Sequence, residues 1–187
     1  MRLSKLVLPS SVEVGGRIYP VKTGHPYWFR FAELLSDRKA VFGDFDFLYD
    51  TDVPPDRKAG FEKLIEFYSP KTELPRKDGA ESSGETVLDF TADSQLIFAA
   101  ILEQYGIDLF EREIHWHKVL AMISGLHSTR LNEIIGYRLY RKPSKNDSTE
   151  REMMKLKKMW RIESADEKKE AEKASENERK FFSKIRR

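Results

Sequence analysis

The sequence predicts a mainly α fold: a compact helical domain with a short N-terminal β-hairpin and an extended, charged C-terminal helix. Three observations support this prediction. Apolar residues recur at spacings of three and four through most of the chain, which is typical of helices packed on a core. Glycines and prolines stand at the ends of these periodic segments, where helices stop. Two short alternating segments flank Gly15-Gly16, a pair that favours the tight turn of a hairpin.

The hairpin and an aromatic helix are the first two elements. The hairpin is expected within residues 11–22, and its second strand should end near Pro20, which cannot donate a hydrogen bond to a neighbouring strand. Pro26 suits the first turn of a helix over residues 27–36, where its missing N–H costs nothing. The apolar face of that helix comprises Trp28, Phe31, Leu34 and Leu35.

The next part of the chain holds one clear helix between two less regular segments. Residues 37–53 leave helix and loop open, because the helical spacing of their aromatic residues competes with a glycine and several aspartates. Residues 70–86 are rich in Gly, Pro and Ser and predict a flexible loop. Between them, Pro54-Pro55 marks the start of a helix over residues 56–69. Its apolar stripe comprises Phe61, Leu64, Ile65 and Tyr68.

The stretch over residues 88–141 has the densest apolar periodicity and predicts three helices joined by short turns. The first should begin at a cap, Asp89 or Thr91, and run to Tyr105. Gly106 follows it, at the position where a left-handed residue ends a helix. The inner face of this helix should comprise Phe90, Ile97, Ala100 and Ile101.

The second and third helices of this stretch follow from capping patterns. Asp108 and Glu111 have the spacing of a capping box, which predicts a helix over residues 108–124. A third, shorter helix is expected to begin at Ser128 or Thr129 and to end at about Tyr137.

A polar break then divides the chain into a helical domain, residues 1–142, and a charged helical extension, residues 143–187. Thr149 and Glu152 have capping-box spacing, so we expect a helix from about Glu150 to Arg161. The rest of the extension is dominated by Glu and Lys and predicts a solvated helix.

The apolar side chains of this extension are the predicted partner-binding residues. Methionine is adaptable enough for the first of its helices to dock either on the core or in a partner's groove. Aromatic residues near the end of the chain suit a segment that orders on contact with another helix. The predicted set is Met153, Leu156, Met159, Trp160, Phe181 and Phe182.

Composition excludes several classes of protein. The chain has 187 residues, no cysteine and a formal net charge of +2 with both signs interspersed. Disulfides, thiolate catalysis and cysteine-ligated zinc are therefore excluded. No apolar run approaches the roughly 18 residues that a membrane span needs, and the first apolar run is too short for a signal peptide. We expect a soluble protein of the cytoplasm in which it is made.

His115-Trp116-His117 is the strongest candidate for a metal site, and its spacing argues against one. Two metal ligands on a helix stand at i and i+4, on one face. Histidines at i and i+2 point roughly 200° apart around a helix. We therefore expect no metal here, with one histidine half-buried beside Trp116 and the other exposed.

The other chemical candidates are incomplete. Ser124 and His127 are too close in sequence for a nucleophile and its base, and the flanking glycines of a nucleophile elbow are absent. No Gly-rich phosphate loop occurs, so the sequence predicts neither a catalytic residue nor a cofactor. An acidic cluster lacks the glycine and the closing glutamate of a calcium loop and should be a solvated face; it comprises Asp44, Asp46, Asp50 and Asp52.

The basic C-terminal end does not predict nucleic-acid binding. Its basic residues interleave with aromatic ones, a pattern found at nucleic-acid interfaces. Acidic residues just upstream cancel the positive field. The basic residues are Lys180, Lys184, Arg186 and Arg187, and the acidic ones are Glu170, Glu172, Glu176 and Glu178.

Three motifs resemble the signature of a small family of tail proteins from phages and prophages of Gram-positive bacteria. The hairpin, the helix that begins near Trp28 and the Pro54-Pro55 pair agree in order, so the resemblance covers roughly residues 10–160. The motifs are structural rather than catalytic. They are Tyr105–Leu109, His115–Leu126 and Ile134–Arg138.

The resemblance implies a non-catalytic function in phage assembly. Members of this family are encoded between the tail tube and tape measure genes, which implies a tail assembly chaperone. Such a chaperone would cover the tape measure protein in the host cytoplasm until tube subunits polymerise around it. The tail tube protein or a second copy of the chain are further expected partners. The alternative is a structural component of the virion, in the tail or at the head–tail connector.

Overall fold

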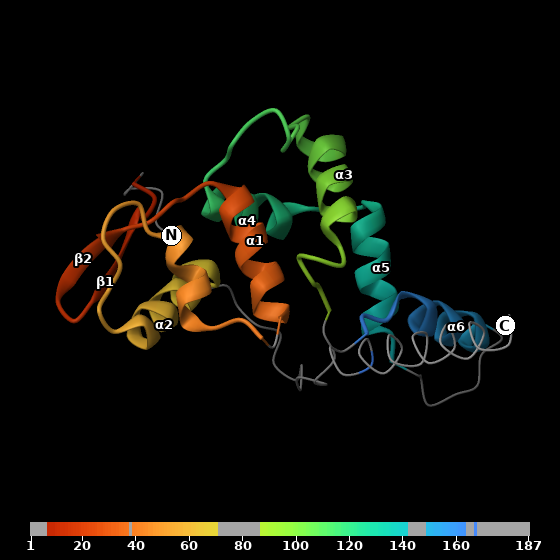
Figure 1. The fold of residues 1–187 in the computed structure, drawn as a ribbon. Coiled ribbons are helices and arrows are strands. Elements are labelled where there is room, and N and C mark those ends of the chain that lie inside the picture. Colours follow the sequence, from red (N-terminus) through yellow and green to blue (C-terminus); the bar gives the residue numbers. More distant parts are fainter. Residues whose placement is uncertain (1–6, 38, 71–86, 142–148, 164–166, 168–187) are drawn as a thin grey trace, which may run out of the picture. The chain divides into compact units, whose positions relative to one another are not determined.

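The protein is mainly α, as predicted, with a two-stranded hairpin near the N-terminus (Figure 1). The computed structural model describes residues 7–37, 39–70, 87–141, 149–163 and 167. The chain divides into two compact units, Met1–Glu133 and Ile134–Arg187. None of the helices in the described ranges is long and apolar enough to cross a bilayer.

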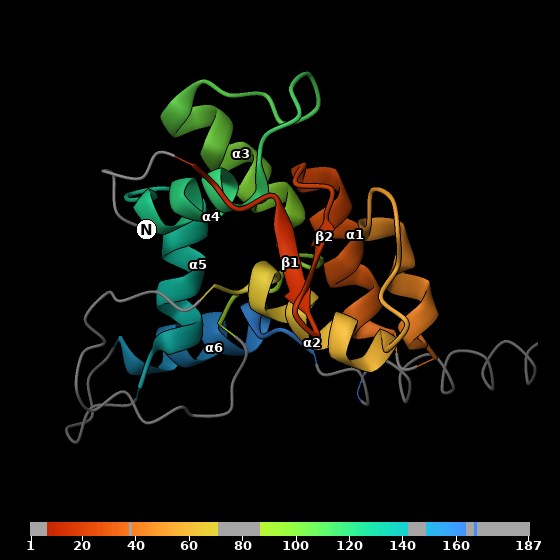
Figure 2. The same cartoon turned by 90° about the vertical axis from the view of Figure 1, so that its left-hand side faces the viewer.

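The hairpin pairs β1 (Ser11–Val14) with β2 (Arg17–Pro20) in antiparallel register, as expected. The backbone φ angles of Gly15 and Gly16 are +58° and +79°. Two successive positive φ angles are what a primed turn requires, and they match the twist of the flanking strands. The strand β1 packs on the helix α2 (Arg57–Tyr68), which gives this otherwise marginal sheet its support (Figure 2).

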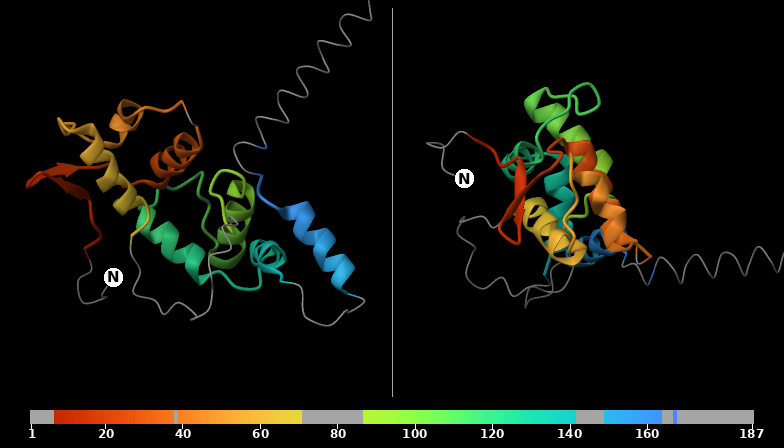
Figure 3. Two further views of the ribbon diagram at one scale, coloured as in Figure 1. Left: turned by 90° about the horizontal axis from the view of Figure 1, so that it is seen from below. Right: turned by 60° about the vertical axis from the view of Figure 1, so that its left-hand side comes forward.

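The segment that the sequence left open forms a 3-10 helix, η1 (Phe42–Leu48), which packs between α1 (His25–Ser36) and α2. Asp44 fixes its start, because the Val41 N–H donates to the Asp44 carboxylate at 2.8 Å. Seen from below, the hairpin, α1, η1 and α2 lie at one end of the first unit, and α3 (Ser94–Tyr105) and α4 (Trp116–Gly125) lie toward the other (Figure 3).

The predicted start of the second helix in the central stretch was wrong. The helix was expected from residue 108, but α4 begins at Trp116. Asp108 does not cap a helix: its carboxylate accepts the Phe110 N–H at 2.7 Å in a local turn. The chain stays extended at His115, which forms a β-bridge with Gly24 and caps α4 itself. The bridge to Gly24, which is distant in sequence, holds His115 extended and so outweighs the local capping-box pattern. The predicted left-handed stop at Gly106 is confirmed, with φ of +65°.

The core of the first unit is aromatic. Trp28 of α1 and Trp116 of α4 are fully buried and their rings stack at 6.5 Å between centroids. Tyr68, at the end of α2, stacks on Trp116 at 5.3 Å and 7°. Each indole N–H donates to a backbone carbonyl, Trp28 to Lys22 at 2.9 Å and Trp116 to Tyr68 at 2.8 Å. These bonds satisfy the polar atom of each large ring, so both can be buried without a desolvation penalty.

Helix faces predicted from spacing are partly corrected. Leu35 was expected on the inner face of α1, but its side chain is 39% exposed. Phe67 of α2 was not predicted in the core, but it is buried and stacks on Trp28 at 4.7 Å. In both helices the buried stripe is rotated slightly from the predicted one, because several faces of these sequences are apolar.

The second unit contains the helix α6 (Glu150–Trp160), and α5 (Arg130–Leu139) spans the division between the units. The Arg138 guanidinium donates to the Trp160 carbonyl at 2.7 Å and caps the C-terminus of α6. Lys157 donates to the Tyr140 carbonyl at 3.2 Å. Thr149 precedes α6 as expected, but its side chain makes no cap hydrogen bond. The predicted division at residue 142 and, apart from residue 70, the predicted loop over residues 70–86 lie outside the described residues and stay predictions.

Candidate interaction surfaces

His115-Trp116-His117 is a structural anchor at the start of α4. His115 Nε2 bonds the Pro9 carbonyl at 2.8 Å, and His117 Nε2 bonds the Phe67 carbonyl at 2.7 Å. The Trp116 indole binds the Tyr68 carbonyl between them. Three consecutive side chains thus tie α4 to the segment before β1 and to the end of α2. Both histidines are half-buried, so the expectation that one is exposed was wrong.

His25 has the same structural role at the start of α1. Its Nε2 bonds the Leu109 carbonyl at 3.0 Å, and its Nδ1 accepts the Ile114 N–H at 3.1 Å. This pair of bonds requires the neutral ring, protonated on Nε2 alone. Burial lowers the pKa of His25 below its usual value, and the hydrogen bond from Nε2 to the Leu109 carbonyl opposes that effect. Burial likewise lowers the pKa of His117, and nearby His115 adds to the effect.

Ser124 and His127 do not act on each other through any described bond. The Ser124 hydroxyl donates to the Leu120 carbonyl at 2.9 Å, one turn back in its own helix. His127 is exposed, and its Nδ1 bonds the Gly125 carbonyl at 3.3 Å. The Ser124 hydroxyl and His127 Nδ1 each have a local backbone partner, so these two side chains are not paired as a nucleophile and its base.

Two aspartates of the acidic cluster join elements through ion pairs. Asp46 pairs with Arg57 at 2.9 Å, which ties η1 to α2. Asp52 pairs with Arg17 of β2 at 2.6 Å. Within the described residues, no group of three His, Cys, Asp or Glu side chains could hold a metal ion.

Four of the predicted partner-binding residues lie on α6. Met153, Leu156 and Trp160 are half-buried, and Met159 is 62% exposed. No residue of α6 is fully buried, although its apolar and charged residues are segregated around the helix. The other two predicted residues, Phe181 and Phe182, lie outside the described part of the chain.

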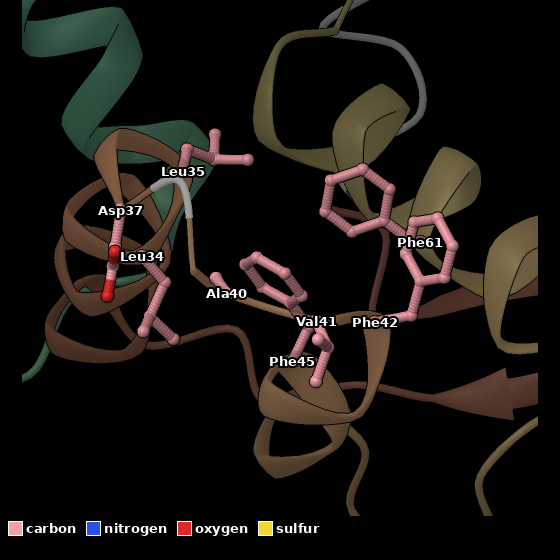
Figure 4. A pocket seen from close by; sticks show the side chains of 8 residues that line it. All are labelled: Leu34, Leu35, Asp37, Ala40, Val41, Phe42, Phe45 and Phe61. Carbon is pink, nitrogen blue, oxygen red and sulfur yellow. The ribbon is translucent and has the colours of Figure 1, made fainter. Parts of the chain in front are cut away.

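A groove that the sequence did not predict opens between α1, η1 and α2. Its volume is about 330 Å³. Figure 4 shows Leu34 and Leu35 on one side of the groove and Phe42 and Phe61 on the other. Val41 and Phe42 at its edge are 64% and 44% exposed. The remaining lining residues are Asp37, Ala40 and Phe45.

The outer side of α3 is a second apolar surface that was not predicted. Leu102 and Tyr105 are exposed there, and Phe98 packs against the exposed Phe110. A signal for it was present in the sequence: Glu103 is the single charged residue between Ser94 and Tyr105. A helix without a polar face must be covered on more than one side.

Comparison with known proteins places the chain in a family. No curated protein and no solved structure matches it. A family model described as Bacteriophage Gp15 protein matches residues 4–162, which cover both the hairpin and the helices. The motifs that suggested a phage protein lie within this match. The chain is therefore a member of the bacteriophage Gp15 protein family.

Proposed function

We propose that this protein is a tail assembly chaperone that binds the tape measure protein in the host cytoplasm and catalyses no reaction. Membership of a bacteriophage protein family supports the viral part of this proposal. The three motifs that resemble tail proteins encoded beside the tape measure gene support the rest. The candidate catalytic groups are engaged in structural hydrogen bonds, which is consistent with a binding role.

The observation that carries the proposal is the incomplete burial of the apolar side chains of α6. This helix has an apolar stripe and no fully buried residue, with Met159 exposed at the edge of the stripe. Half-covered apolar stripes on amphipathic helices are suited to helix-in-groove or helix-on-helix binding. Methionine side chains can repack against different partner residues, which suits a long and varied partner such as a tape measure helix. The groove in Figure 4 offers a further apolar site for side chains of the same partner.

Co-expression with the tape measure gene product tests the proposal. The chain should raise the soluble yield of the tape measure protein and copurify with it. The double substitution Met159→Ser and Trp160→Ser should weaken this complex at least tenfold. The capping bond from Arg138 uses the Trp160 backbone carbonyl, so it survives the substitution.

Met154→Ser is the matched control. Met154 is 45% exposed on the same helix but lies roughly 100° around it from Met153, away from the stripe. It should leave the complex intact. An unchanged yield and no copurification with the wild-type chain would refute the proposal. Detection of the chain by mass spectrometry in purified mature particles would favour the structural virion component instead.

A further inference from the structure

The helix α3 has two apolar faces, and only one of them is used in the core. Ile97, Ala100 and Ile101 are buried against the first unit. Beside them on the helix, the stripe Phe98, Leu102 and Tyr105 follows i, i+4, i+7 spacing, and Phe110 extends it. Leu102 is 41% exposed and Phe110 is 86% exposed. These four residues are called the α3 outer face below.

Contacts within the first unit order part of the α3 outer face and the helix that carries it. The Tyr105 hydroxyl donates to the Met122 carbonyl at 3.0 Å, and the Gln104 amide donates to the Gly125 carbonyl at 3.1 Å. The rings of Phe98 and Phe110 pack edge to face at 4.8 Å between centroids. A surface whose side chains are already ordered loses little entropy on binding, so it is preorganised for a partner.

The charged residues within α3 and in the segment that follows it are mostly acidic. Glu103 lies on the helix, and Asp108 and Glu111 flank Phe110. Arg112 is the single basic residue between positions 94 and 113. No ion pair joins Glu103 or Glu111 to another described residue. The negative field repels nucleic-acid phosphates and anionic membranes and attracts a cationic partner.

From this geometry we infer that the α3 outer face binds an amphipathic helix of a partner protein, with lysine or arginine residues bordering its apolar stripe. Phe98, Leu102 and Tyr105 form a helical ridge about 10 Å long, which fits the groove of another helix. The acidic residues then pair with the lysine or arginine residues of the partner, so the face prefers a cationic helix to an anionic one. This site is separate from α6 and does not rest on the proposed function.

Peptide binding to the full chain tests the inference. The probes are two fluorescein-labelled amphipathic peptides, one of leucine and lysine and one of leucine and glutamate. By fluorescence anisotropy, the wild-type chain should bind the lysine peptide at least tenfold more tightly than the glutamate peptide. Leu102→Gln with Phe110→Gln should weaken binding of the lysine peptide at least tenfold. Leu139→Gln, at a leucine that is 54% exposed on α5, is the matched control and should bind as the wild type does.

A charge-reversed variant tests whether the acidic residues near the α3 outer face, rather than acidic residues elsewhere on the protein, set the preference for the lysine peptide. Glu103→Lys with Glu111→Lys should reverse the preference toward the glutamate peptide, and circular dichroism should show an unchanged helical content. Failure of the wild type to bind the lysine peptide would overturn the inference, as would an unchanged preference in the reversed variant. A dimer that dissociates when Leu102 and Phe110 are replaced would also overturn it, because a second copy would then be the occupant.

Discussion

At the scale of single residues, Tyr49 and Gly60 lie close together where η1 is followed by α2. The Tyr49 hydroxyl is buried without a hydrogen-bond partner among the described residues, and its burial raises the pKa of Tyr49 to about 12. A Cβ placed on Gly60 would lie 2.8 Å from that hydroxyl and 3.2 Å from Pro54 Cγ. Gly60 therefore lies inside the helix α2, where the Tyr49 side chain leaves no room for a methyl group.

Two substitutions at this contact should have opposite effects. Tyr49→Phe removes an unsatisfied polar atom and should raise the free energy of unfolding by about 1 kcal/mol. Gly60→Ala should lower it by about 1 kcal/mol or more, because the strain of the added methyl exceeds the gain in helix propensity. Urea unfolding of the purified chain measures both.

Gly136→Ala is the control for helix propensity. Gly136 lies inside α5 with open space around its Cβ position, so alanine there should stabilise the chain by roughly 0.5–1 kcal/mol. If Gly60→Ala stabilises the chain as much as Gly136→Ala does, the packing argument is wrong. In the Tyr49→Phe background, the cost of Gly60→Ala should fall, since the closest atom is gone.

At the scale of elements, the starts of α1 and α4 are joined by neutral histidines. His25 connects the start of α1 to the segment that leads into α4, and His117 connects α4 to the end of α2. Burial lowers the pKa of both rings. The unfolded chain then binds more protons than the folded chain at mildly acidic pH, so acid favours unfolding.

Stability should therefore fall as the pH is lowered through about 6.5, the pKa of an unfolded histidine, toward the lower folded values. The stabilisation by the neutral rings is fully present above pH 6.5. Each histidine can add at most about 1.4 kcal/mol per pH unit to the slope. Urea unfolding between pH 5 and pH 8 measures this slope, and His117→Gln should reduce it. His127→Gln, at an exposed histidine, should leave the slope unchanged, and an equal reduction in both variants would contradict the assignment.

At the scale of the whole molecule, the chain is two compact units rather than one continuous core. The aromatic core around Trp28 and Trp116 belongs entirely to the first unit. The second unit holds α6, which has no fully buried residue. Folding stability should thus reside mainly in the first unit, and partner binding by α6 should cost little of it.

Truncation after residue 142, which removes α6 and keeps α5 whole, tests this distribution of stability. The shortened chain should still unfold cooperatively, with a thermal midpoint within about 5 °C of that of the full chain, because little apolar area is removed from the core. It should no longer copurify with the tape measure protein. A fragment without a cooperative transition, measured by circular dichroism or calorimetry, would show that the residues after 142 are needed for stable folding and would contradict the prediction.

Local signals predicted much of the fold. The positive φ angles of Gly15, Gly16 and Gly106 are required by a hairpin turn and a helix end, and each depends on neighbours within a few residues. The α6 residues proposed for binding also followed from local periodicity. The groove at Phe42 and the α3 outer face did not, because periodicity shows which residues are apolar but not which of them other elements cover.

The sequence by itself determined the order of the elements, the hairpin and most helix ends, because these depend on backbone conformations that individual residues favour. The tertiary structure alone decided where α4 begins, that residues 42–48 form a 3-10 helix and what the histidines do. His115 bonds Pro9 across 106 positions of the chain, and His25 bonds Leu109 across 84. Such partners are absent from any local window. The bond of His25 is buried, where an unpaired polar group is costly, so partners that are distant in sequence decide the local backbone.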